Sequence, residues 1–109
     1  MQFTQEQKNQ FLDKLANRTQ EGIWVTDMAL MKHTEQLAKK KALLTIIEGK
    51  LEKKEYPSAR DGKNEKRQVE TDIANLEAEI QESKLLMETG RTDLELIEEY
   101  RQKPVEESA

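Results

Sequence analysis

The sequence contains no cysteine, which excludes disulfides, thiolate metal sites and cysteine nucleophiles together. Aromatic residues make up only 5% of the chain and hydrophobic residues 35%, whereas 37% of the residues are charged. A sheet sandwich needs more apolar side chains, so this composition indicates either long exposed helices or a disordered chain. The apolar residues recur at regular spacing, which favours helices over disorder.

The sequence also lacks long hydrophobic runs. No apolar run approaches the ~18 residues that a membrane-spanning helix requires. Residues 1–8 lack the apolar stretch of a secretory signal peptide. We therefore expect a cytoplasmic protein without a membrane partner.

Recognisable catalytic motifs are missing as well. The sequence has no glycine-rich phosphate loop, no Gly-x-Ser-x-Gly and no His-Glu-x-x-His. Its one histidine, His33, has no neighbouring cluster of His, Cys or Asp that could complete a metal site. We predict that the protein is not an enzyme, that it takes no cofactor, metal or small-molecule substrate, and that His33 is a partly buried packing residue.

Signals for helix starts and stops divide the chain. Thr4 followed by Gln7 fits a capping box, which predicts a first helix over about 4–20 that ends before Gly22. Residues 22–26 are apolar and β-branched, so we expect this connection to pack against the rest of the chain.

Two longer helices follow. Asp27 is a good N-cap for a helix over about 28–55, which Pro57 ends. Either Ser58 or Asp61 can cap the next helix, over about 62–102, which Pro104 ends. These elements predict a single elongated helical domain over 1–109 with a polar C-terminal tail at 104–109.

Apolar residues on both long helices repeat every seven positions, as in coiled coils. The repeats are Leu30, Leu37, Leu44 and Leu51 on the first helix, and Val69, Leu76, Ser83, Gly90 and Ile97 with Ile73, Ile80, Met87 and Leu94 on the other. With a turn centred near residue 58, antiparallel pairing sets Leu51 near Val69 and brings Lys39, Lys40 and Lys41 opposite Glu77 and Glu79. The sequence thus predicts an all-α fold built on an antiparallel coiled-coil hairpin.

The last helix is longer than its partner, so its C-terminal part is left uncovered. That part carries Leu94, Leu96, Ile97 and Tyr100. The first helix carries Phe11, Leu12 and Leu15 and can cover it. We therefore predict that the short helix over about 4–20 completes a three-helix arrangement.

A second apolar ridge remains once the hairpin is paired. A two-helix hairpin cannot bury this ridge, so another molecule or the first helix must. Trp24 can be a packing anchor or a binding residue. The candidate partner-binding residues are Trp24, Leu43, Ile46, Leu85, Leu96 and Tyr100. They favour a protein-interaction or assembly function, as an adaptor, chaperone-like protein or scaffold, with a homo-oligomer favoured over a monomer.

Charge suggests two alternative functions. Residues 50–67 carry seven basic and four acidic groups, and residues 68–109 carry four and twelve. The candidate phosphate contacts at the basic turn are Lys53, Lys54, Lys66 and Arg67, which fits a nucleic-acid accessory protein as well as a simple solvated loop. The net charge of −4 disfavours nucleic acid. The acidic arm over 88–107 fits a small inhibitor or regulator of a partner protein.

Overall fold

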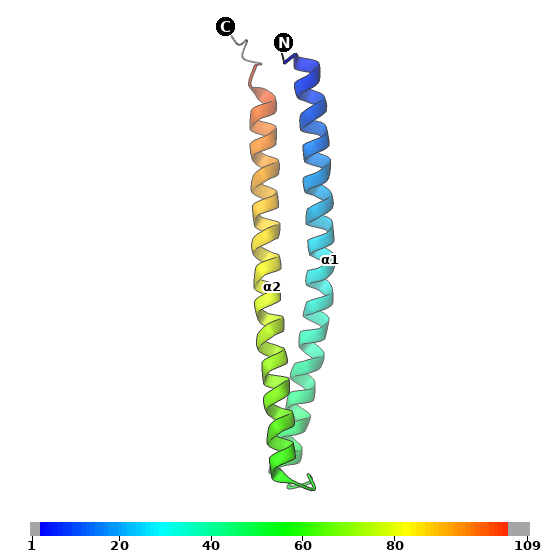
Figure 1. Ribbon diagram of the computed structural model, residues 1–109, viewed down its shortest axis with the longest axis vertical. Coiled ribbons are helices and arrows are strands. Elements are labelled where there is room, and N and C mark those ends of the chain that lie inside the picture. The colour runs from blue at the N-terminus through cyan, green and yellow to red at the C-terminus, as the bar shows by residue number, and fades with distance from the viewer. Residues whose placement is uncertain (1–2, 105–109) are drawn as a thin grey trace. The chain divides into compact units, whose positions relative to one another are not determined.

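The computed structural model describes residues 3–104, and it contains two long helices with no strand among these residues. Helix α1 spans Gln5–Glu52 and helix α2 spans Ala59–Gln102. The chain divides into two compact units, one formed by residues 1–28 with 84–109 and the other by residues 29–83. In each unit a segment of α1 lies beside a segment of α2 that runs in the opposite direction (Figure 1). The predicted all-α helical hairpin is confirmed.

Two of the capping signals predicted from the sequence lie at helix starts, whereas the prediction of Asp27 as an N-cap is wrong because Asp27 lies inside α1. The backbone N–H of Thr4 donates to Oε1 of Gln7 at 2.9 Å, and the N–H of Gln7 donates to Oγ1 of Thr4 at 3.1 Å, which is the reciprocal capping box. At the start of α2, the N–H of Asp61 donates to Oγ of Ser58 at 3.4 Å, so Ser58 is the cap.

Lys54, two residues after the last residue of α1, adopts a left-handed conformation with φ of 56°. The N–H of Glu55 donates to the Lys50 carbonyl at 3.0 Å, and the N–H of Lys54 donates to the Leu51 carbonyl at 3.2 Å. This pair of bonds is the Schellman motif, which is more often built with glycine at the left-handed position. The end of α1 therefore depends on local bonds rather than on Pro57 alone.

The prediction of a separate N-terminal helix over about 4–20 is wrong, and with it the three-helix arrangement. Helix α1 passes through Gly22, whose φ is negative. An interior glycine costs about 1 kcal/mol relative to alanine, which is too little to end a helix whose inward face continues to pack. Oγ1 of Thr26 donates to the Gly22 carbonyl at 2.8 Å, so the β-branched segment also fits the helix.

The inward positions of α1 keep one seven-residue period through the expected break. Those that are buried or half-buried include Leu12, Thr19, Thr26, His33, Lys40 and Ile47 at one heptad position and Ala16, Ile23, Leu30, Leu37 and Leu44 at the other. Threonines occupy two of these positions, which is why the repeat is hard to see from apolar residues alone.

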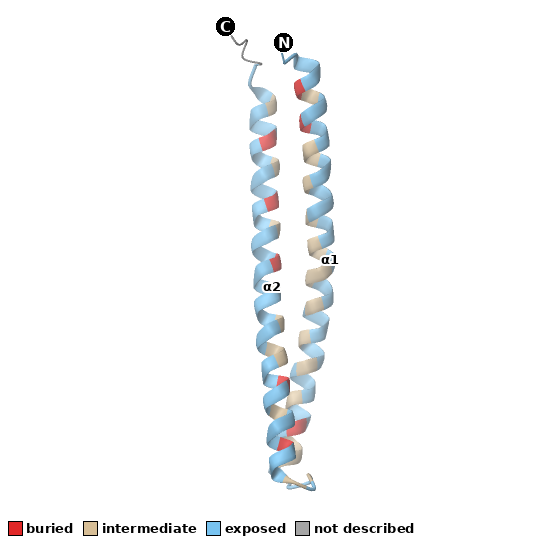
Figure 2. Cartoon of the chain, viewed as in Figure 1, coloured by how far each residue is buried: buried red, intermediate tan, exposed pale blue. Residues whose placement is uncertain are grey.

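The predicted heptads of α2 are confirmed by burial (Figure 2). Val69, Ser83, Gly90 and Ile97 are buried, although two of them are small, and Leu76 is half-buried. Other half-buried members of the seam are Ile73, Ile80, Met87 and Leu94.

The predicted register is wrong by roughly one helical turn. Leu51 lies against Gly62, whose added Cβ would come within 2.6 Å of the leucine Cδ2, rather than near Val69. Lys40 pairs with Asp72, while the predicted pairing of Lys41 with Glu77 is present at 3.7 Å. The turn between Glu52 and Ala59 is centred before residue 58. When the centre of the turn moves by one residue, the residue of α2 that lies opposite a given residue of α1 changes by two positions.

Candidate functional site

The unit formed by residues 1–28 and 84–109 has an open apolar groove between α1 and α2. It is lined by Phe11, Leu12, Leu15, Thr19, Asp93, Leu96, Ile97 and Tyr100. Leu12 and Ile97 form its floor with 2% and 8% of their surface exposed. Phe11, Leu96 and Tyr100 remain 53%, 55% and 48% exposed. The sequence prediction that Phe11, Leu12 and Leu15 cover Leu96, Ile97 and Tyr100 is therefore met only in part.

A buried lysine, Lys8, lies next to Tyr100 at one end of this groove. Lys8 is 1% exposed, and its Nζ lies 4.4 Å from the centre of the Tyr100 ring and donates a hydrogen bond to the Lys103 carbonyl. A cation at this place neutralises the negative end of α2 and satisfies a carbonyl that the helix leaves unpaired. Lys8 thus orients Tyr100 beside the groove, a role that the pattern of apolar residues does not predict.

We call the four large side chains Phe11, Leu15, Leu96 and Tyr100 the groove face. Two of these, Leu96 and Tyr100, are among the partner-binding residues predicted from the sequence. Exposed apolar side chains that rest on a buried floor are typical of protein-interaction sites. The groove face brings the predicted residues Leu96 and Tyr100 together with Phe11 and Leu15 in one apolar surface.

The other predicted partner-binding residues lie elsewhere. Trp24 is 65% exposed, so the interpretation of this residue as a packing anchor is wrong. Leu85 belongs to the same unit as the groove face and is 54% exposed. Leu43 and Ile46 are in the unit formed by residues 29–83, at 37% and 59% exposure.

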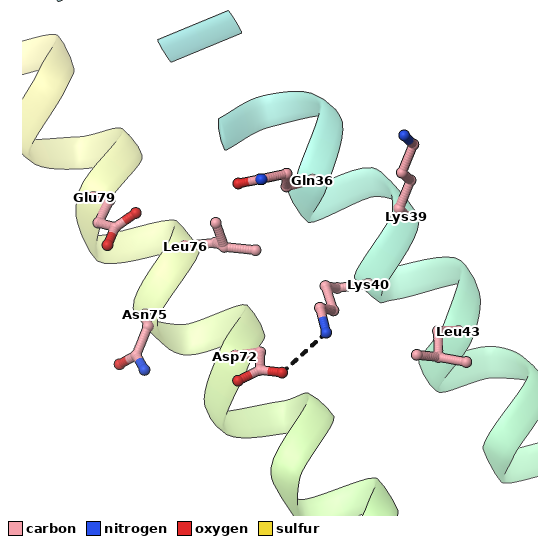
Figure 3. A pocket seen from close by; sticks show the side chains of 8 residues that line it. All are labelled: Gln36, Lys39, Lys40, Leu43, Asp72, Asn75, Leu76 and Glu79. Atoms are coloured by element: carbon pink, nitrogen blue, oxygen red, sulfur yellow. Dashed lines mark hydrogen bonds and ion pairs between the residues drawn. The ribbon is translucent and has the colours of Figure 1, made fainter. Parts of the chain in front are cut away.

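A second groove lies in the unit formed by residues 29–83; most of its lining residues are polar, although the surface they present to it is mainly apolar. Its lining comprises Gln36, Lys39, Lys40, Leu43, Asp72, Asn75, Leu76 and Glu79 (Figure 3). Nζ of Lys40 lies 3.0 Å from Oδ2 of Asp72, and Nε2 of Gln68 donates to Oδ1 of Asp72 at 3.1 Å. The hydrogen bond from Lys40, followed by that from Gln68, holds the pKa of Asp72 below its ordinary value.

His33 also contributes to this unit's polar seam. Its Nε2 lies 3.2 Å from Oε2 of Glu79, and its buried Nδ1 has no hydrogen-bond partner among the described residues. The partly buried position predicted for His33 is confirmed, since 26% of its side chain is exposed. The contact between His33 and Glu79 and the ion pair between Lys40 and Asp72 join the two helices of this unit.

The four candidate phosphate contacts do not form one cluster. Lys53 and Lys54 follow the end of α1, whereas Lys66 and Arg67 lie in the third turn of α2. Nζ of Lys66 already lies 4.0 Å from Oε1 of Glu48. At the same turn, Nζ of Lys50 lies 4.4 Å from the centre of the Tyr56 ring, so part of the basic charge there is used in packing.

Neither described helix contains a stretch apolar enough to cross a lipid bilayer. Within residues 3–104, no three His, Asp or Glu side chains are grouped so that they could hold a metal ion. The predicted tail at 104–109 lies, from residue 105 onward, outside the described part of the chain. Comparison with protein-family models, with curated proteins and with solved structures finds no match to this chain.

Proposed function

We propose that this protein is a non-enzymatic interaction or assembly protein that binds a protein partner through the groove face. The observation that carries the proposal is the exposure of Phe11, Leu96 and Tyr100, at 53%, 55% and 48%, over a buried apolar floor. Burying apolar surface stabilises a complex by roughly 25 cal/mol per Å² before the costs of association. Three half-exposed large side chains over a common floor can therefore act as a binding centre.

The arrangement around the groove supports a helical partner. Two antiparallel helices present a groove between them, and a third or fourth helix fits such a groove by placing its side chains between theirs. Lys8 holds Tyr100 from below, so the aromatic ring is positioned before any partner arrives. A side chain that is already positioned loses less conformational entropy on binding.

A photo-crosslinking experiment tests the proposal. The photoreactive analogue p-benzoyl-phenylalanine replaces Phe11 in the full chain produced in its source cells, and a matched chain carries the analogue at exposed Asn17. We expect ultraviolet light to link the Phe11 chain to a discrete protein, either a second copy or another protein, and the Asn17 chain to give much less product. Equal labelling from both positions, or none from either, contradicts the proposal.

A further inference from the structure

The unit formed by residues 1–28 and 84–109 has two unlike faces. On one face, Nη1 of Arg101 lies 2.9 Å from Oδ1 of Asp13 and its Nε lies 3.3 Å from Oε2 of Glu98. These contacts close that face with paired charges. The other face is the groove face, where Phe11 and Leu96 have no comparable cover from the described residues.

A stripe of uncharged residues runs along α2 from Leu96 toward the start of the helix. Leu85, Thr89, Thr92 and Leu96 follow at intervals of four, three and four residues, which places them in one stripe. None of the four is charged.

A corresponding stripe runs along α1. Phe11, Leu15, Arg18 and Gly22 follow at helical intervals, and a Cβ added at Gly22 would meet no atom within 4 Å. The space over Gly22 is therefore open. The two stripes carry one charged side chain, Arg18, and Asp93 also lines the groove between the helices.

Opposite charges flank the two stripes. Lys14 lies beside the α1 stripe, three residues after Phe11, and Glu99 lies beside the α2 stripe, three residues after Leu96. Both are exposed, and neither forms an ion pair with the described residues. The Asp13–Arg101 ion pair sets the local register, so Lys14 and Glu99 lie at nearly the same level of the unit.

We propose that the groove face binds a second copy of this chain, with α1 of each copy over α2 of the other. A two-fold axis parallel to the helices produces this arrangement, a four-helix bundle with antiparallel neighbours. Lys14 of each copy then meets Glu99 of the other, while Phe11 and Leu15 meet Leu96 and Tyr100. The face is therefore complementary in charge to a copy of itself, because the basic residue and the acidic residue at one level each meet the opposite charge, and this favours a second copy.

Charge reversal tests this arrangement by sedimentation equilibrium over a concentration series. We expect the wild-type chain to dimerise and Lys14→Glu or Glu99→Lys to weaken dimerisation by about 10-fold, because two attractive pairs become repulsive. An equimolar mixture of the two variants should regain wild-type affinity, since each mixed dimer restores both opposite-charge pairs. Reversal of Arg91, which is exposed and outside the groove face, is the matched control and should leave the dimer unchanged.

Substitutions of exposed apolar residues distinguish a specific dimer from nonspecific apolar association. Leu96→Glu should weaken dimerisation by at least about 30-fold, as expected for a buried central residue, with the helical content of the chain preserved. Trp24→Ser removes the most exposed large apolar side chain and should have no effect. An equal loss in both variants would show indiscriminate apolar association and overturn the proposal.

The dimer rests on the proposed function, and its failure can be told apart from the failure of that function. A wild-type chain that stays monomeric at every concentration, or charge variants that do not rescue each other, would overturn the dimer. If the photoreactive Phe11 chain then links to a different protein, the proposed interaction function still stands. If it links to nothing, both proposals fail.

Discussion

Gly90→Ala offers a direct test of how tightly the two helices approach in the unit that carries the groove face. A Cβ at position 90 would lie 2.6 Å from Cγ1 and 3.0 Å from Cδ1 of Ile23. Alanine is favoured over glycine inside a helix by about 1 kcal/mol, whereas overpacking costs about 1–3 kcal/mol. Because Cγ1 lies near the backbone of Ile23 and moves little, we expect the steric cost to exceed the gain and the variant to lose about 1 kcal/mol.

Urea unfolding followed by far-ultraviolet circular dichroism measures this loss. Gly49→Ala is the matched control, because a Cβ there meets nothing within 4 Å and should stabilise the chain by up to about 1 kcal/mol. In an Ile23→Ala background the obstructing atoms are gone, and Gly90→Ala should then stabilise the chain. A gain from Gly90→Ala in the wild-type background equal to that of the control would refute the close contact.

Three further substitutions probe individual contacts. Lys8→Met should cost about 1–2 kcal/mol in urea unfolding, because it removes the cation–π contact with Tyr100 and a charged hydrogen bond to a carbonyl just past α2. The pKa of Asp72 is lower in the folded chain than its ordinary value of 3.8, so the stability that this carboxylate contributes is present above pH 3.8 and is lost as the pH falls through the folded-state pKa. The difference in unfolding free energy between wild type and Asp72→Asn should therefore shrink on acidification. The pKa of Tyr56 is raised above 10.0 by burial first, then by its hydrogen bond to Glu65 and by the negative charge of Glu65. The stability that the neutral Tyr56 phenol contributes is therefore lost as the pH rises through the folded-state pKa. In a Tyr100→Phe background, absorbance titration of the phenol should shift to lower pH on Glu65→Gln.

The helix starts could be predicted from sequence because their chemistry is local. The reciprocal bonds between Thr4 and Gln7 involve residues three apart, and so does the cap from Ser58 to Asp61. The helix end predicted at Gly22 was wrong because whether a glycine ends a helix depends on the packing around it, which is not local in sequence. The next residue, Ile23, fills the space over Gly90, a contact between residues distant in sequence that no local signal reveals.

The register and the groove depended on features that sequence spacing alone does not fix. The length of the turn decides which residues oppose each other, and the left-handed Lys54 ends α1 earlier than Pro57 would. The groove face was predicted only in part. Leu96 and Tyr100 were predicted as partner-binding residues, whereas Phe11 and Leu15 were assigned to a separate helix that covers them. Lys8 was missed altogether, because a buried lysine looks like a surface residue in sequence.

Close contact between the helices compensates only in part for the small apolar core, and this bears on the proposed dimer. At Gly62 and Gly90 helix α2 has no side chain, and Leu51 and Ile23 of α1 occupy the space instead, so these positions tighten the seam rather than weaken it. Even so, among the residues that the structure describes in the unit that carries the groove face, only Leu12 and Ile97 are buried large apolar residues. A core this small leaves little stability to spare. Covering Phe11 and Leu96 with a second copy would stabilise the folded chain by mass action, so folding and association of this unit should strengthen each other.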